Sequence, residues 1–117
     1  MKHLKRKRIL HRKKDQRKAL IKSLVVNLIL KEKIKTTLAK AKEAQKKIER
    51  LITIAKKQNL TAFRRIKKEL PLKVTKKLYY ELVPKYLERK GGYTRIIKTY
   101  QRKINDASLL VILELVK

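Results

Sequence analysis

Apolar residues in the first half of the chain recur every three or four positions, which is the spacing of an amphipathic helix. Leu20, Leu24 and Leu28 show this spacing, and Asp15 before them is a candidate N-cap, so a first helix is expected from 15 to about 30. A second helix is expected after Thr37, which is again a candidate cap. Its inward-facing positions are Leu38, Ala41, Ala44, Ile48, Leu51, Ile52 and Ala55.

Two shorter helices follow. Gln58-Asn59 interrupts the apolar spacing, Thr61 can cap a helix through Leu70, and Pro71 ends it because proline disfavours helical geometry in the residue before it. A fourth helix is expected over about 72–83. Pro84 either stops this helix or opens one further turn. The inward positions of the fourth helix are Val74, Leu78, Leu82 and Val83.

The period changes from 3.6 to 2 after Gly91-Gly92, where basic and polar residues alternate with apolar ones over 93–100. A second apolar run covers 109–116, and the polar stretch 101–107 between the two is expected to be a loop. The β-branched stretch 33–37 is short enough to be either a loop or an edge strand. Two strands are therefore expected at the C-terminal end, and 33–37 is a candidate for a third strand.

These elements predict a single α+β domain over residues 15–117, with about four helices packed on a small, three-stranded sheet. A chain of 117 residues with 43% hydrophobic residues is long enough for one modest core. Residues 1–14 carry eight Lys and Arg and no acid, and their apolar residues define no buried face. We expect them to form a basic, extended N-terminal tail that is disordered when free.

Composition adds one strong constraint, which is charge. The chain holds 36 Lys and Arg against 9 Asp and Glu, a formal net charge of +27, so like charges repel in every compact arrangement unless an anionic partner offsets them. The absence of cysteine excludes disulfides and thiol nucleophiles, and it fits a reducing compartment such as the cytoplasm without proving it. No apolar stretch approaches the ~18 residues of a membrane span. A polyanion is therefore the expected partner.

The two glycines of the chain, Gly91 and Gly92, suggest either a phosphate-binding loop or a turn. A phosphate-binding loop places spaced glycines between a strand and a following helix, so that backbone N–H groups converge on the anion. Here the order is reversed, because the glycines follow a helix and precede a strand. This order favours a turn with a glycine at positive φ and argues against nucleotide binding.

No group of residues has the spacing of a catalytic or metal site. His3 and His11 lie in the tail without Cys, Asp or Glu at ligand or triad spacing. The acidic residues are scattered, and Glu43 stands one helical turn before Lys47 as an ordinary surface pair. We therefore expect no enzyme activity, no cofactor, no metal and no small-molecule substrate.

The basic residues are more numerous than solubility requires, and the excess gathers in three places. These are residues 1–18, the stretch from Arg64 to Lys68, and the stretch from Arg89 to Lys103. Clusters of this kind are typical of surfaces that contact the phosphates of a nucleic acid. The arginines among them are the better candidates for forked phosphate contacts or base stacking.

The tyrosines are a second source of nucleic-acid contacts, because bases stack on aromatic rings. Tyr93 and Tyr100 flank basic residues in a predicted strand and are the best candidates for stacking. Tyr79, Tyr80 and Tyr86 lie in or next to a predicted helix and are expected in the core or at its rim.

Six segments of the chain, taken in order, point to a known family. They are "MKH" at the start, "RKAL" at 17–20, "IKTTLAKAKE" at 34–43, "LITIAKK" at 51–57, "KGGYTRIIK" at 90–98 and "ILEL" at 112–115. In this order they resemble the bacterial-type large-subunit ribosomal protein L-seventeen family. "TTLAKAKE" followed by "GGYTRI" is the specific part of the resemblance, which runs collinearly from Met1 to the C-terminus.

The resemblance implies an α+β domain with an N-terminal extension, bound to large-subunit rRNA as a non-enzymatic structural constituent of the ribosome. It also implies a place near the polypeptide exit side of the subunit, beside other ribosomal proteins, in the cytoplasm or in an organelle. Family motifs and basic clusters together give the rRNA-binding candidates Lys2, His3, Lys5, Arg6, Lys7, Arg8, His11, Arg12, Lys13, Lys14, Arg17, Lys18, Thr36, Thr37, Lys40, Arg64, Arg65, Arg89, Tyr93, Thr94, Arg95, Lys98, Arg102 and Lys103.

The chain departs from the family pattern in the tail and in the last loop. Family members usually have glycine at the positions of Lys7 and His11, and histidine at the position of Gln16. Their last loop usually carries Gly-Asp and a proline, whereas this chain has "INDAS" at 104–108. These differences bear on the backbone path of the tail and on the turn of the C-terminal hairpin.

Two other functions are compatible with the charge. A DNA-binding architectural protein of the nucleoid would be favoured by a dimer motif, a base-reading helix or an intercalating wedge, and none is evident. A basic protein of membrane surfaces would need helices with a bulky aromatic face, which this chain lacks. We therefore expect rRNA binding, with DNA binding as the alternative.

Overall fold

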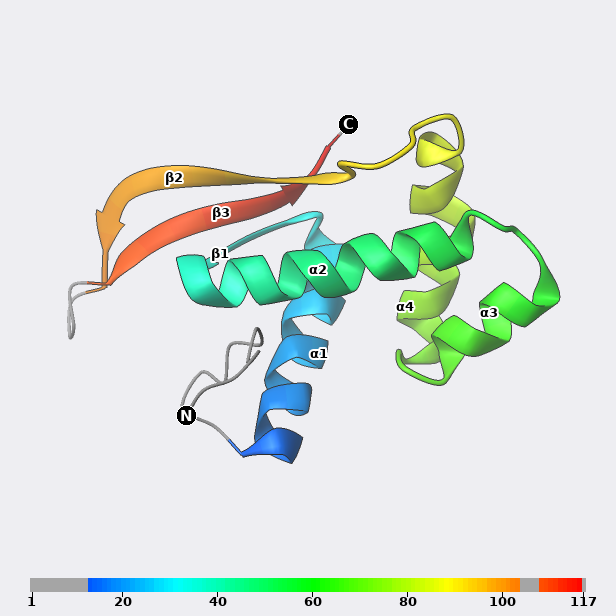
Figure 1. Cartoon of the computed structure of the whole chain (residues 1–117), viewed down its shortest axis with the longest axis horizontal. Helices are drawn as coiled ribbons and strands as arrows, with labels where there is room; N and C mark the ends of the chain where they lie inside the picture. Colours follow the sequence, from blue (N-terminus) through cyan, green and yellow to red (C-terminus); the bar gives the residue numbers. More distant parts are fainter. Residues whose placement is uncertain (1–12, 104–107, 117) are drawn as a thin grey trace, which may run out of the picture.

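The computed structural model of the protein describes residues 13–103 and 108–116. Its helices, shown in Figure 1, are α1 (Lys14–Lys31), α2 (Leu38–Ala55), α3 (Leu60–Lys67) and α4 (Leu72–Lys76). A π-helical turn, η1 (Lys77–Leu82), and a 3-10 turn, η2 (Val83–Tyr86), continue α4. The strands are β1 (Lys33–Thr37), β2 (Thr94–Arg102) and β3 (Leu109–Leu115). The α+β class expected from the sequence is confirmed.

The three strands form one antiparallel sheet in the order β1-β3-β2. β3 lies in the middle and pairs with both edges, so that Leu113 faces Ile34 of β1 on one side and Ile96 of β2 on the other. The stretch 33–37, which the sequence left open between loop and strand, is thus an edge strand. In Figure 1 the β2–β3 hairpin runs along α2 and extends past the N-terminal end of that helix.

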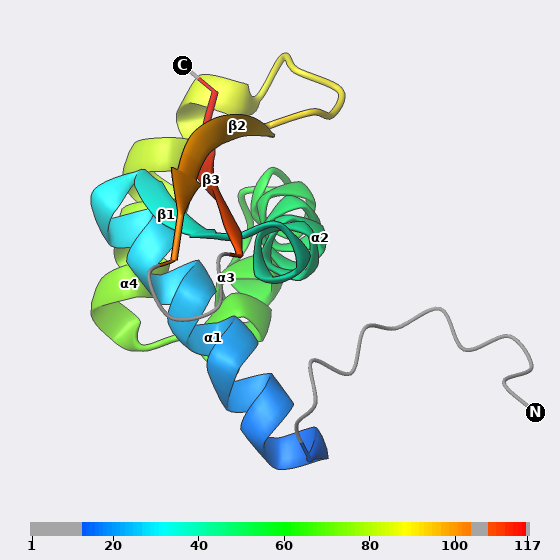
Figure 2. The same cartoon turned by 90° about the vertical axis from the view of Figure 1, so that its left-hand side faces the viewer.

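The core forms where α2 packs across the sheet, and α2 touches all three strands. Val111, Leu113 and Leu115 of β3 are buried on the side that faces α2, as the alternation of a strand requires. The end-on view of α2 in Figure 2 shows the helix lying beside the sheet. Of the inward positions predicted for α2, Leu38 is half-buried; the buried ones are Ala41, Ala44, Ile48, Leu51, Ile52 and Ala55.

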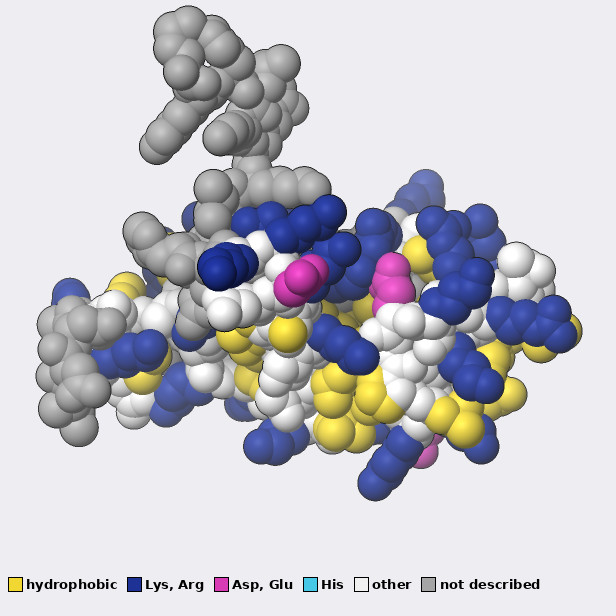
Figure 3. Space-filling model, turned by 90° about the horizontal axis from the view of Figure 1, so that it is seen from below, with side chains coloured by type: hydrophobic (Ala, Val, Ile, Leu, Met, Phe, Trp, Pro, Cys, Tyr) yellow, Lys and Arg dark blue, Asp and Glu magenta, His cyan; other side chains and the backbone are white. Residues whose placement is uncertain are grey.

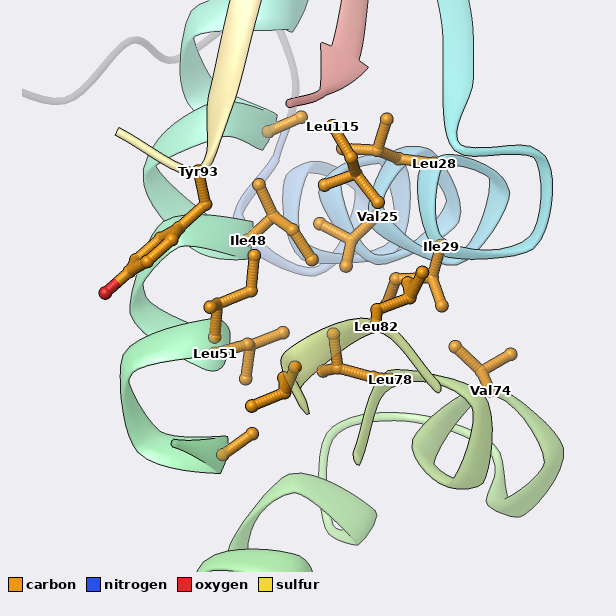
Figure 4. Close-up of a cluster of buried hydrophobic side chains, with 14 of the residues drawn as sticks. Val25, Leu28, Ile29, Ile48, Leu51, Val74, Leu78, Leu82, Tyr93 and Leu115 are labelled. Carbon is orange, nitrogen blue, oxygen red and sulfur yellow. The ribbon is translucent and has the colours of Figure 1, made fainter. Parts of the chain in front are cut away.

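Two more parts of the chain complete the core around the same buried face of α2 (Figure 4). The C-terminal half of α1 contributes Val25, Leu28 and Ile29, and α4 with η1 and η2 contributes the four inward positions that the sequence predicted. Pro84 lies in the first turn of η2, where the N–H that proline lacks has no helical partner to lose. Pro84 therefore opens a further turn and does not stop the helix.

The N-terminal half of α1 projects away from this core (Figures 1 and 2). Residues 13–16 are exposed, and Leu20, Ile21 and Leu24 are only partly buried. Apolar residues are regularly spaced along the whole of α1, but only those in the C-terminal half of the helix are covered by the sheet and η1. The first half leaves a cleft between α1, α2 and the end of α3.

The helix caps differ from the predicted ones. α1 begins after Lys13, so Asp15 lies in the first turn, where a negative charge favours the helix dipole. Thr37 occupies the N-cap position of α2, but its side chain makes no capping hydrogen bond. Asn59, and not Thr61, caps α3, because its side-chain oxygen accepts a hydrogen bond from the backbone N–H of Ala62 at 2.8 Å.

The diglycine turn generates a stability prediction. Gly92 has φ +62° and Gly91 does not have positive φ, although a Cβ on either residue would meet nothing within 4 Å. Gly92→Val should therefore lower the free energy of unfolding by about 1–3 kcal/mol, because a β-branched residue is strained at positive φ. Gly91→Val is the matched control and should be close to neutral. Urea unfolding followed by circular dichroism measures both, and an equal loss in the two variants would contradict the turn.

Candidate nucleic-acid interface

The turn between η2 and β2 is held in place by α2. The carboxylate of Glu49 accepts hydrogen bonds from the backbone N–H of Tyr93 at 3.3 Å, the backbone N–H of Thr94 at 3.0 Å and the hydroxyl of Thr94 at 2.8 Å. Two helical turns further along α2, the ammonium group of Lys56 donates to the Tyr93 hydroxyl at 2.9 Å and to the backbone carbonyl of Arg89. One helix face therefore holds both ends of the turn.

Tyr93 belongs to the core. Its ring is 2% exposed and lies beside Ile48 and Leu51 with the hydroxyl pointing away from the cluster (Figure 4). The ring centroids of Tyr93 and Tyr86 are 5.4 Å apart. The Tyr86 hydroxyl donates a hydrogen bond to the backbone carbonyl of Val116 at 2.6 Å, and burial raises the pKa of this hydroxyl. The prediction that Tyr93 stacks on a base is wrong, because its faces are covered by protein.

Two threonine candidates are also buried. Thr94 is 6% exposed and its hydroxyl is engaged by Glu49, while Thr36 is 8% exposed in β1. Little of either side chain is left to face RNA. The segment "GGYT" at 91–94 was a strong signal in the sequence, and the contacts around it are internal to the protein.

Most of the other candidates lie on the surface. Arg17, Thr37 and Lys40 are half-buried. The exposed ones are Lys13, Lys14, Lys18, Arg64, Arg65, Arg89, Arg95, Lys98, Arg102 and Lys103. The tail candidates Lys2, His3, Lys5, Arg6, Lys7, Arg8, His11 and Arg12 lie outside the described residues, as do the expected disorder of the tail and the turn over 104–107.

The first exposed basic surface is the projecting end of α1, with Lys14, Arg17, Lys18 and Lys22. Figure 3 views the molecule from the side toward which α1 points, and Lys and Arg side chains gather over the upper part of the described surface. At 100° per residue these four cations fall within an arc of about 140° around the helix. This side of α1 suits contacts with the phosphates of a folded RNA.

The second basic surface is the β2–β3 hairpin. Tyr100 is fully exposed there and has Lys98 and Arg102 close by in the strand, so it remains a candidate for base stacking. Ile97 is 40% exposed on the sheet face that points away from α2, and Lys35 of β1 donates a hydrogen bond to the Gln101 side chain of β2. The hairpin therefore combines cations, an aromatic ring and apolar surface.

Glu114 connects the three strands on this outer sheet face. Its carboxylate accepts a hydrogen bond from Nε of Arg95 at 2.5 Å and lies 3.7 Å from Nζ of Lys33, and these two residues stand opposite Glu114 in the register. The Arg95 hydrogen bond is the main reason that the pKa of Glu114 is lowered, although burial opposes this shift. Arg95 is thus a structural residue as well as a candidate for RNA contact.

A third basic surface shares Arg17, Lys18 and Lys22 with the first and was missed in part by sequence reasoning. It is the cleft of about 770 Å³ between α1, α2 and the end of α3, which is lined by seven Lys and Arg and two Glu. Lys22, Lys46, Lys47, Arg50 and Lys68 of this cleft were not among the candidates. They come from three elements far apart in the sequence, and no spacing rule relates them. The one sequence signal is the run of charges on the solvent face of α2.

Two kinds of feature are absent from residues 13–103 and 108–116. No helix there is long and apolar enough to span a membrane. Within the same residues no group of three or more His, Cys, Asp or Glu is placed to hold a metal ion.

Comparison with known proteins decides the family. The model of the Ribosomal protein L17 family matches residues 20–116. This chain belongs to that family. Large ribosomal subunit protein bL17 of Fusobacterium nucleatum is 46% identical over 120 residues, which cover 99% of this chain and 100% of that protein. The bL17 protein of Hydrogenobaculum sp. is 45% identical, and the alignment covers 100% of this chain and 100% of that protein. The bL17 protein of Phytoplasma mali is 48% identical, and the alignment covers 88% of this chain and 93% of that protein.

The family membership confirms the resemblance seen in the sequence. In this member of the L17 family, the motif "KGGYTRIIK" builds a turn and a strand whose first residues are held by α2. Its last residues carry exposed side chains on the hairpin. One motif therefore contains a structural half and a surface half.

The Glu49 contacts lead to a second prediction. Glu49→Ala should lower the free energy of unfolding by about 1–3 kcal/mol, because two backbone N–H groups lose a charged acceptor. Amide exchange at Thr94 should also become faster, since β2 loses its attachment to α2 at that end. The control is Glu81→Ala, which removes an exposed carboxylate from η1. Similar exchange rates at Thr94 in both variants would show that Glu49 does not hold the turn.

The Glu114 contacts lead to a third prediction. Because its folded-state pKa is lowered, ionised Glu114 stabilises the protein above its unfolded pKa of about 4.3, and this stabilisation is lost as pH falls through the folded pKa. Glu114→Gln should therefore be less stable than wild type at pH 7, with a difference that shrinks toward pH 3. Urea titrations at several pH values measure this. A difference that is independent of pH would contradict the ionic contact with Arg95.

Proposed function

We propose that this chain is a structural constituent of the large ribosomal subunit that binds rRNA and supports translation without catalysing a reaction. The observation that carries the proposal is the full-length similarity to proteins named large ribosomal subunit protein bL17. The exposed cations of α1, α3 and the hairpin provide the chemistry, because each Lys or Arg that meets a phosphate releases a counterion. Such a protein works in the ribosome, in the cytoplasm or within an organelle.

The globular domain supplies fixed positions for these cations. Apolar residues of α2 and of the sheet fill the core, so the basic side chains of α1, α3 and β2 are left on the surface. Two arms, the projecting half of α1 and the β2–β3 hairpin, extend from the body in different directions (Figure 1). Two basic arms on one rigid body can contact separate rRNA segments and hold them at a fixed distance.

The N-terminal segment extends the first arm. Residues 1–14 carry eight Lys and Arg, and they join the projecting end of α1, where Arg17 and Lys18 continue the positive charge. A fully extended segment of this length reaches about 45 Å. We infer that it acts as a separate tail next to the domain of residues 15–117 and becomes ordered between rRNA segments, because an acid-free peptide can follow phosphates on both sides.

Neighbouring ribosomal proteins near the polypeptide exit side are the proposed protein partners. This placement rests on the family resemblance. Exposed apolar side chains support contact with protein in general: Leu60 is 61% and Tyr80 63% exposed, and the Tyr80 ring centroid lies 6.1 Å from that of Phe63. A DNA-binding role has no comparable support, since the relatives reported above are named for the large subunit.

Cosedimentation tests the proposed function. Ribosomal subunits from cells that express the tagged full-length chain are separated on sucrose gradients and washed with high salt. The chain should remain with the large subunit after the wash. Release into free fractions, or recovery with DNA, would overturn the proposal.

The tail gives a fourth prediction. Deleting residues 2–12 removes six Lys and Arg and none of the described residues. The slope of log affinity for RNA against log salt should fall by up to about 4, because fewer counterions are released. The circular dichroism of the domain should stay nearly the same, and its loss would contradict the division into tail and domain.

A charge-matched control separates the tail from net charge. It replaces six exposed lysines outside the proposed surfaces by glutamine, and these are Lys31, Lys42, Lys57, Lys73, Lys76 and Lys85. The control should change the salt slope less than the deletion does. An equal change would mean that the tail acts only through the net charge of the chain.

A further inference from the structure

We propose that the cleft between α1, α2 and the end of α3 binds an unpaired segment of RNA, with a base on its apolar floor and phosphates on its basic rim. The proposal rests on the rRNA-binding function above and deepens it by naming the form of RNA that one surface takes. The cleft has a volume of about 770 Å³. This lies within the range of about 300–1,000 Å³ that small-molecule pockets span, so a nucleotide fits.

The rim carries cations that are not neutralised within the described part of the chain. Arg17, Lys18 and Lys22 line the cleft from α1, and Lys68 lines it from the end of α3. None of these four forms an ion pair with a described acidic residue. Four cations facing one concave surface attract a chain of phosphates.

The cations that line the cleft from α2 differ from those of α1, because they form ion pairs with glutamate side chains. Nζ of Lys47 lies 2.8 Å from Oε2 of Glu69, and Arg50 lies 3.4 Å from the other oxygen of the same carboxylate. Nζ of Lys46 lies 3.6 Å from Glu43. These pairs attach the end of α3 to α2 and fix one wall of the cleft. The cations of α1 supply the charge that attracts phosphates, whereas the paired residues of α2 fix the position of the opposite wall.

The floor is apolar. Ile21 and Val25 of α1 and Leu70 after α3 line the cleft between the charged walls. Ile21 is partly buried and supplies the accessible apolar surface of the floor, while Val25 and Leu70 are buried beneath it. An apolar floor below a basic rim matches a nucleotide, whose base is flat and weakly hydrated and whose phosphate is charged.

This combination favours unpaired RNA over two other anions. A duplex keeps its bases stacked inside the helix, so it presents only phosphates and sugars and cannot use the floor. An acidic peptide would place its carboxylates next to Glu43 and Glu69, which lie in the same cleft. The bases of unpaired RNA instead carry N–H groups, such as the N3–H of uracil, that can donate to carboxylates.

Photo-crosslinking tests the position of the base. The full-length chain is mixed with an RNA octamer of uridines that contains one 4-thiouridine, irradiated, digested and mapped by mass spectrometry. Crosslinks are expected within residues 17–25 or 68–70. Crosslinks confined to the hairpin or to α3, with none in these two segments, would overturn the proposal.

Matched variants test the rim. The cleft variant Lys18→Gln, Lys22→Gln, Lys68→Gln and the control variant Lys31→Gln, Lys73→Gln, Lys85→Gln each remove three exposed positive charges. The cleft variant should lower the salt slope of octamer binding by about 2, at roughly 0.7 per lost phosphate contact, and it should lose the mapped crosslinks. The control should retain the crosslinks and most of the slope.

Competitors identify the ligand. Unlabelled uridine octamer should displace the crosslinking octamer from the cleft, whereas a peptide of eight glutamates and a 16-base-pair RNA duplex should do so poorly. Equal competition by the peptide or the duplex, or equal slopes in the two variants, would overturn the cleft proposal. The proposed function would still stand if the wild-type chain cosediments with large subunits, and it would fail separately if the chain does not.

Discussion

The burial of one face of α2 is the constraint on which the rest of the structure depends. A three-stranded sheet with one solvated face needs a helix to bury the other, and α2 lies across all three strands. Ala41 and Ala44 allow close approach, while Ile48, Leu51 and Ile52 fill the space toward α1 and η1. The same helix uses its polar residues to hold the turn before β2. Apolar packing and hydrogen bonds on α2 thus fix where the two basic arms start.

The charge of the chain is compatible with this core because the two are separated. The described Lys and Arg side chains are exposed or half-buried. Several of the few acidic residues form hydrogen bonds or ion pairs that connect one secondary-structure element to another. Glu49 connects α2 to β2, Glu69 connects the end of α3 to α2, and Glu114 connects the three strands. These acidic residues stabilise contacts within the fold, and they are too few to neutralise the positive charge, so a large excess remains on the surface of the protein. That excess makes the folded domain a binding surface for a polyanion.

The helices and their buried faces were predictable from the sequence, because a periodic pattern over ten or more residues outweighs local exceptions. Caps were less predictable, since the choice between Asn59 and Thr61 depends on one hydrogen bond. The position of Tyr93 was mistaken because burial at the start of β2 depends on how α2 docks, which no local pattern contains. The cleft was missed for a similar reason: Lys22, Arg50 and Lys68 meet only after three helices have packed.

In the proposed function, a folded domain presents two basic arms to ribosomal RNA. The most direct measurement is an electron cryo-microscopy map of large subunits purified from cells that produce this chain. Density for the chain should show the N-terminal half of α1 and the β2–β3 hairpin each lying against rRNA phosphates. A map in which the two arms face solvent, or in which the chain is bound only to protein, would contradict it.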